Sequence, residues 1–100
     1  MQPIYGPARV ILCMSVNPSA TDAMIDQMIQ YVPSLQPGLY IYGHDNVTQQ
    51  WRQVGRVRRV FRDGHDICQE VDIAPGVEVA SFPPFYTRIL PMPDREAGNA

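Results

Sequence analysis

Apolar and polar positions along this chain follow two different periods, and the change from one to the other marks the predicted elements. Residues Ala8 to Val16 form a nearly unbroken apolar run rich in branched side chains, which predicts a buried strand. A helical period follows, and it predicts one amphipathic helix over about residues 18–32. Asn17 and Pro18 favour its start, and Pro33 ends it because the residue before a proline avoids helical backbone angles. Its apolar stripe consists of Met24, Ile25, Met28, Ile29 and Val32.

Beyond the helix, Pro and Gly divide the chain into short apolar segments that predict strands. These segments are 39–42, 67–73, 77–81 and 85–90.

The segment 47–62 fits either a helix or a strand. Gly55 and four Val residues disfavour the helix, and the Asp63-Gly64 pair favours a hairpin turn into 67–73. We therefore predict a strand and a hairpin. On that strand one face carries Val57 and Phe61, and the other carries Arg56, Arg58 and Arg62.

These elements predict an α+β fold, with one helix packed on a mostly antiparallel sheet of about five to six short strands. The expected order is a right-handed β-α-β unit followed by a meander. The length of 100 residues indicates one domain, 1–90, and the polar segment 91–100 predicts a flexible C-terminal tail.

Charge changes this picture at one segment, Trp51 to Arg62, which contains five of the eight Arg residues and no acid. The whole chain lacks Lys and has a net charge of −2. Clustered Arg side chains bind carboxylate or phosphate groups bidentately, which makes this segment a candidate binding surface. Its basic residues are Arg52, Arg56, Arg58, Arg59 and Arg62. The alternative is a solvated strand face on which these cations pair with Glu70, Asp72 and Glu78 of neighbouring strands.

Aromatic side chains supply further candidates. Trp51 begins the basic segment, and Phe82, Phe85 and Tyr86 surround the rigid pair of prolines in the segment 81–86. Aromatic residues beside proline are typical anchors for a partner protein. The alternative is that Phe82 and Phe85 close the hydrophobic core.

Cysteine and histidine give a weaker signal. His65 and Cys68 have a spacing seen in zinc sites, but on a strand their side chains point to opposite faces. We therefore expect Cys13 and Cys68 to be small core residues, although two cysteines also allow one disulfide. No metal and no cofactor is predicted. Because neither a leader nor a membrane span is recognisable, the expectation is a soluble, cytoplasmic, reduced protein.

The leading functional hypothesis is a small non-enzymatic interaction protein, an adaptor or inhibitor of the kind that phages and mobile elements encode. It binds another protein through the Arg-rich face and the exposed aromatics. One alternative is a nucleic-acid-binding domain in which Tyr40 and Tyr42 provide stacking platforms. Another is a small enzyme built on Cys68, His65 and Asp66. A homodimer paired through the edge segment 85–90 is compatible with all three hypotheses.

Overall fold

The computed structural model describes residues 4–45, 48–82 and 86–91. Within these ranges one helix packs against an antiparallel sheet of five strands in the order β2-β3-β4-β1-β5, which confirms the predicted α+β class. The strands are β1 (Ala8–Ser15), β2 (Tyr40–Asp45), β3 (Gln50–Asp63), β4 (Asp66–Ile73) and β5 (Arg88–Pro91).

The helix α1 spans Asp22–Tyr31, inside the predicted range. Its N-cap is Thr21, whose side-chain oxygen accepts a 3.2 Å hydrogen bond from the amide of Met24. Asn17 instead caps the preceding turn, where its side chain accepts a hydrogen bond from the amide of Ser19. Pro33 ends the helix as expected and begins the 3₁₀ turn η1 (Pro33–Leu35).

The ambiguous segment is a strand, so the predicted hairpin is confirmed. β3 and β4 are joined by the two-residue loop Gly64-His65, which connects the register pair Asp63 and Asp66. Gly64 has a φ of 63°, the left-handed region that the first loop residue of a type II′ turn requires. The long strand β3 continues past β4 and pairs its first half with β2.

Two sequence expectations about connectivity are wrong. β1 and β2 do not form a β-α-β unit, because β3 and β4 lie between them and all strand pairs are antiparallel. The predicted strand 77–81 ends instead in a 3₁₀ turn, η2 (Val79–Ser81). The amide of Val79 donates to the carbonyl of Ile4, so this segment pairs with the N-terminal residues rather than with the sheet.

The predicted last strand, 85–90, is β5, which begins at Arg88 and runs to Pro91. Phe85 and residues 92–100 of the predicted tail lie outside the described residues.

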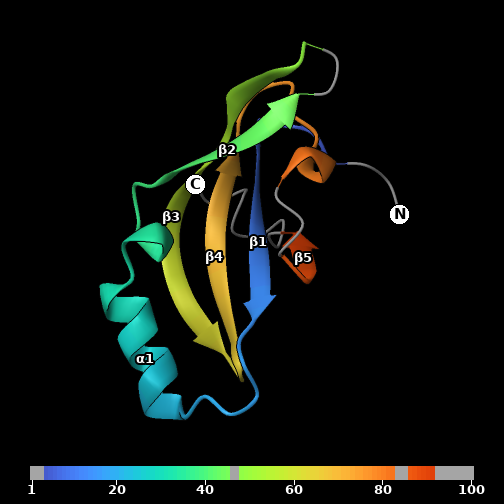
Figure 1. The fold of residues 1–100 in the computed structure, drawn as a ribbon. Helices are drawn as coiled ribbons and strands as arrows, with labels where there is room; N and C mark the ends of the chain where they lie inside the picture. Colours follow the sequence, from blue (N-terminus) through green and yellow to red (C-terminus); the bar gives the residue numbers. More distant parts are fainter. Residues whose placement is uncertain (1–3, 46–47, 83–85, 92–100) are drawn as a thin grey trace.

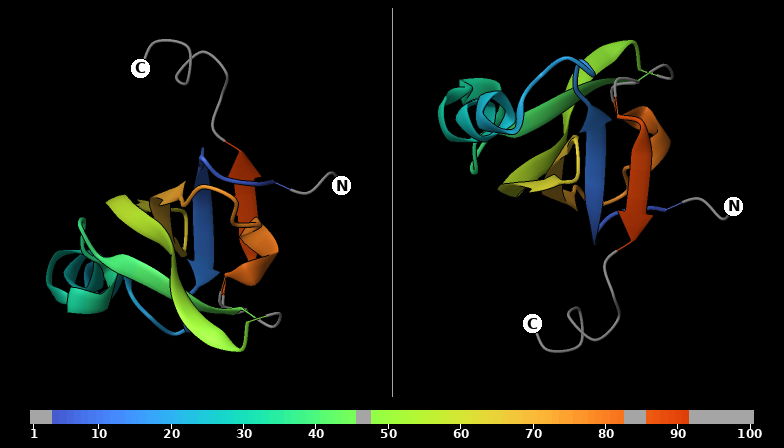
Figure 2. Two further views of the ribbon diagram at one scale, coloured as in Figure 1. Left: turned by 90° about the horizontal axis from the view of Figure 1, so that it is seen from above. Right: turned by 90° about the horizontal axis from the view of Figure 1, so that it is seen from below.

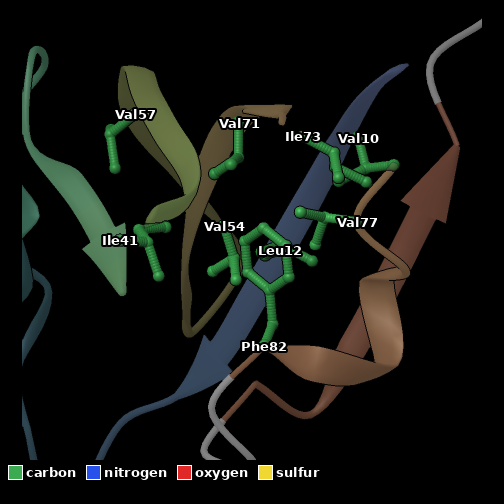
Figure 3. Close-up of a cluster of buried hydrophobic side chains, with 9 residues drawn as sticks. All are labelled: Val10, Leu12, Ile41, Val54, Val57, Val71, Ile73, Val77 and Phe82. Atoms are coloured by element: carbon green, nitrogen blue, oxygen red, sulfur yellow. The ribbon is translucent and has the colours of Figure 1, made fainter. Parts of the chain in front are cut away.

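One face of the sheet carries the core. The register pairs Val10 with Val71 and Met14 with Ile67, so these side chains share that face. At one end, α1 covers a cluster around Ile25, Leu35 and Ile67. At the other end, the segment 77–82, which contains η2, covers a larger cluster, and Figures 1 and 2 show α1 and η2 on opposite flanks of the molecule. The buried members of the larger cluster are Val10, Leu12, Ile41, Val54, Val57, Val71, Ile73, Val77 and Phe82 (Figure 3).

The second face of the sheet has neither α1 nor η2 packed on it, and we call it the open face. Cys13 and Cys68 are register partners at its centre, with their Cα atoms 4.1 Å apart, and they form a disulfide between β1 and β4. Both are fully buried. Among the described residues, no helix has the length and apolar character needed to cross a membrane.

Candidate interaction surface

A β-bulge in β3 determines where the Arg side chains point. The register with β4 shifts between Val57 and Arg59, so both Arg58 and Arg59 reach the open face. A shift of one residue reverses the faces of every later side chain. Phe61 therefore lies on the open face opposite Cys68, whereas Arg62 turns toward α1. The predicted division, with Phe61 beside Val57 and Arg62 beside Arg56, is wrong for this reason.

The cations at the centre of the open face are paired with carboxylates of β4. Arg9 Nε donates a 2.9 Å hydrogen bond to Asp72 Oδ1, and this bond raises the pKa of Arg9 above its ordinary value. Arg58 Nη1 lies 3.2 Å from Asp72 Oδ2. Glu70, whose side chain is only 14% exposed, lies within 4 Å of both Arg58 and Arg59. At these positions the structure therefore matches the alternative interpretation, a strand face on which the Arg side chains pair with carboxylates of a neighbouring strand.

Two further Arg residues are paired in the same way at the other end of the sheet. Arg62 lies 3.2 Å from Asp22 and 3.8 Å from Asp26, which links β3 to α1. Arg88 Nη2 lies 3.2 Å from Asp63 and 2.9 Å from Asp66. The hydrogen bond to Asp63 is the main reason that the pKa of Arg88 lies above its ordinary value.

Arg56 has a different environment. It lies between Tyr40 of β2 and Asp72 of β4 in one register row. Because Asp72 already contacts Arg9 and Arg58, the Arg56 guanidinium stacks instead on the Tyr40 ring, 5.4 Å from its centroid. Among the described residues, no carboxylate lies within ion-pair distance of Arg56. Arg52 lies opposite Gly43 and is exposed.

Three large aromatic side chains lie on the open face of β2 and β3, and one of them, Tyr40, contacts Arg56. Tyr40, Tyr42 and Trp51 are 44%, 55% and 72% exposed. Alternation along β2 places Tyr40, Tyr42 and His44 on the same face. Trp51 is the register partner of His44, and the two rings pack edge to face. We call Tyr40, Tyr42, Trp51 and Arg56 the aromatic surface. Sequence reasoning selected Trp51 and Arg56, but it assigned the tyrosines only to the nucleic-acid alternative.

The remaining predicted anchors do not belong to this surface. Phe82 is 8% exposed, and its ring packs among Val54, Leu12 and Val77, so it is a core residue as the alternative held (Figure 3). Tyr86 is partly buried, its hydroxyl donates a 2.9 Å hydrogen bond to Gln69, and burial raises its pKa to about 12. Phe85 lies outside the described residues.

The structure does not bring the cysteine and histidine candidates together into a reactive pair. The sulfur of Cys68 is bonded to Cys13, and His65 in the β3–β4 loop contacts the carbonyl of Asn17 at 3.0 Å. Across the described ranges, no group of three or more His, Cys, Asp or Glu side chains is arranged to hold a metal ion.

Comparisons with known proteins assign no family. No protein-family model, no curated protein and no solved structure matches the chain. The functional proposal therefore depends on the geometry and charge of the aromatic surface.

Proposed function

We propose that this protein is a small non-enzymatic interaction protein that binds another protein through the aromatic surface. The observation that carries the proposal is the row of three exposed aromatic side chains on the open face of β2 and β3. At one end of this row Arg56 stacks on Tyr40, and its guanidinium has no carboxylate partner among the described residues. Trp, Tyr and Arg are the residues that most often dominate the binding energy of protein interfaces. Paired strands hold the backbone of these residues, so little backbone conformational entropy is lost on binding.

The ion pairs favour a protein partner over nucleic acid. Binding to a phosphate backbone gains its affinity from several cations that neutralise phosphates at once. Here Arg58, Arg59 and Arg62 already lie within 4 Å of carboxylates. Phosphate contacts would have to replace those pairs. One Arg stacked on Tyr40, with two further aromatic side chains along the same face, is better matched to a compact protein epitope.

No catalytic step is part of the proposal. The alternative of a small enzyme needs Cys68 as a thiolate nucleophile, and in this structure its sulfur is half of a buried disulfide.

Several finer aspects stay predictions from the sequence. They are the role as adaptor or inhibitor, an origin in a phage or mobile element, a homodimer, and a cytoplasmic location. The disulfide between Cys13 and Cys68 provides the test of location, because cytosolic thiol systems keep most protein cysteines reduced.

Affinity capture with matched variants tests the proposed function. Tagged wild-type protein is compared with Tyr42→Ser/Trp51→Ser, and with Tyr31→Ser as a control that removes a 73% exposed tyrosine from α1. We expect one protein to be recovered stoichiometrically by wild type and by the control, insensitive to nuclease, and lost with the double variant. Equal recovery by all three proteins would remove the aromatic surface from the proposal. Recovery that disappears with nuclease would favour nucleic acid instead.

A further inference from the structure

The two edges of the sheet are protected to different degrees. β5, at one edge, has four residues and ends at Pro91, which has no amide hydrogen to offer. β2, at the other edge, has six residues without proline, and among the described residues it pairs only with β3. Short strands and prolines are the usual protection of sheet edges, so β2 is the edge to which another strand can add.

The hydrogen bonds beside β2 show which of its main-chain groups face outward. The amide of Val57 donates a 2.8 Å hydrogen bond to the carbonyl of Leu39. Hydrogen-bonded pairs alternate along an antiparallel ladder, so the next such pair is Gly55 with Ile41. Tyr40 lies between them. Its amide and carbonyl therefore point away from β3, toward the free edge.

The side chains next to this edge indicate the charge of an added strand. Tyr40 and Tyr42 are two residues apart on the open face, a spacing of about 7 Å that matches alternate side chains of a neighbouring strand. Arg56 lies behind Tyr40 and extends over its ring toward β2. Two strand spacings, about 10 Å, separate Arg56 from an added strand, and an extended Arg and Glu together span that distance.

We infer that the aromatic surface receives an extended, acidic segment of the partner protein, which adds to the sheet as a strand beside β2. The segment's main chain hydrogen-bonds to the outward groups of Tyr40, and one of its carboxylates pairs with Arg56 over the Tyr40 ring. This inference rests on the proposed function and specifies the kind of segment that is bound.

A second copy of this chain meets these requirements less well. If two copies pair along β2 with their open faces on the same side, the residues of β2 that share the face of Arg56 are Tyr40, Tyr42 and His44. None of them is a carboxylate. An acidic segment from a different protein supplies the counter-charge that a second copy lacks.

The test uses a phage-displayed library of random twelve-residue peptides, selected in parallel on three proteins. These are wild type, Arg56→Gln, and the control Arg59→Gln, which alters an Arg of the same face that pairs with Glu70. We expect wild type and Arg59→Gln to enrich peptides in which Asp or Glu alternates with β-branched or aromatic residues. Arg56→Gln should lose the acidic enrichment and bind the best selected peptide about two- to five-fold more weakly.

Main-chain pairing is tested separately with the best selected peptide. N-methylation of alternate residues, in each of the two registers, should weaken binding at least about ten-fold in one register, because the methyl groups remove hydrogen bonds to β2. On the protein side, Tyr40→Pro removes the outward amide and Tyr40→Ala retains it. We expect Tyr40→Pro to bind more weakly than Tyr40→Ala at equal thermal stability.

Each other outcome contradicts the inference in a recognisable way. Selected peptides without acidic residues, or binding that N-methylation does not change in either register, would exclude an acidic added strand. A dimer in sedimentation that Tyr40→Pro dissociates would assign the edge to a second copy. If no peptide is selected but the capture experiment still recovers a partner through Tyr42 and Trp51, the strand addition fails and the proposed function stands. Loss of capture as well as peptide selection would remove both.

Discussion

The hydroxyl of Tyr86 donates a 2.9 Å hydrogen bond to Oε1 of Gln69, the one buried polar side chain among the described residues. The amide nitrogen of the same Gln69 side chain donates to the carbonyl of Leu35 in η1. Gln69 pairs in register with Leu12 of the larger cluster and with Val60, which packs against the cluster under α1. One side chain thus connects the segment before β5 to the helical side of the molecule.

The Tyr86 contact predicts a loss of stability in alkali. Burial raises the pKa of Tyr86 to about 12, above the value of 10.0 for an ordinary tyrosine. In the unfolded chain the phenol loses its proton at lower pH, so the unfolded state binds fewer protons between the two values. The contribution of the protonated Tyr86 to the unfolding free energy is complete below pH 10 and is lost as the pH rises toward 12. Urea unfolding at several pH values should show this decline.

Tyr86→Phe is the matched variant for that experiment. At neutral pH it leaves Oε1 of Gln69 without its donor, and we expect a loss of about 1–3 kcal/mol in unfolding free energy. The difference between wild type and variant should shrink above pH 10, because the phenol then ionises in the unfolded wild-type chain while it stays protonated in the folded protein, which lowers the unfolding free energy of the wild type. A difference that stays constant up to pH 12 would contradict the assigned pKa.

Loss of the disulfide should destabilise the fold strongly. Cys13 and Cys68 are 55 residues apart, and closing a loop of that length lowers the entropy of the unfolded chain by an amount worth about 4 kcal/mol. We expect Cys13→Ala/Cys68→Ala to unfold at a much lower urea concentration than the oxidised wild type. Alkylation of the protein immediately on cell lysis, followed by mass measurement, reports whether the bond exists in the cell. Fully alkylated cysteines would indicate a reducing compartment.

Gly55 should not tolerate a side chain. A Cβ at this position would lie 2.7 Å from Cζ of Phe82 and 2.8 Å from Cγ1 of Val71, closer than real Cβ atoms approach. We expect Gly55→Ala to cost about 1–3 kcal/mol in thermal or urea unfolding. Combining it with Phe82→Leu should recover part of that loss, because the smaller side chain vacates the contact. Strictly additive effects of the two substitutions would exclude the contact as the cause.

Substitutions at Arg56 and at Arg58 should have different effects on partner capture and on the unfolding free energy. Arg58→Gln removes contacts to Asp72 and Glu70, and we expect it to lower stability by no more than about 1 kcal/mol and to leave partner capture unchanged. Arg56→Gln should weaken capture while leaving stability nearly constant, since the Arg56 guanidinium stacks on the exposed Tyr40 ring and forms no ion pair with the described carboxylates. Quantitative capture and thermal unfolding of both variants measure the two effects. An equal loss of capture in the two variants would indicate that the whole Arg segment, and not Arg56 alone, contacts the partner.

The elements that sequence predicted correctly are those with strong local signals. Pro33 ends α1, and Gly64 supplies the positive φ of the β3–β4 loop. The bulge after Val57 has no comparable signal, because an extra residue in one strand is determined by the neighbour with which it pairs. That one residue decided the faces of Phe61 and Arg62. Strand order was equally hidden, because β1 pairs with β4 and β5 across long stretches of sequence.

The candidate site was predictable only in part for the same reason. The Arg segment and Trp51 could be selected from composition, and Glu70 and Asp72 were recognised as alternative partners of these cations. The stacking of Arg56 on Tyr40 depends on the register row that joins Tyr40, Arg56 and Asp72 across three strands. Long-range register of this kind also brings Cys13 opposite Cys68.

The place of β1 in the sheet has a consequence for synthesis on the ribosome. Both neighbours of β1 come from later in the chain, since β4 begins at Asp66 and β5 at Arg88. At a translation rate of roughly 5–20 residues per second, the apolar strand leaves the ribosome several seconds before β4 does. During that interval Val10 and Leu12 have no sheet to enter, so the nascent chain exposes an apolar segment of the kind that chaperones bind. The sheet as a whole is completed only near the end of translation of these residues.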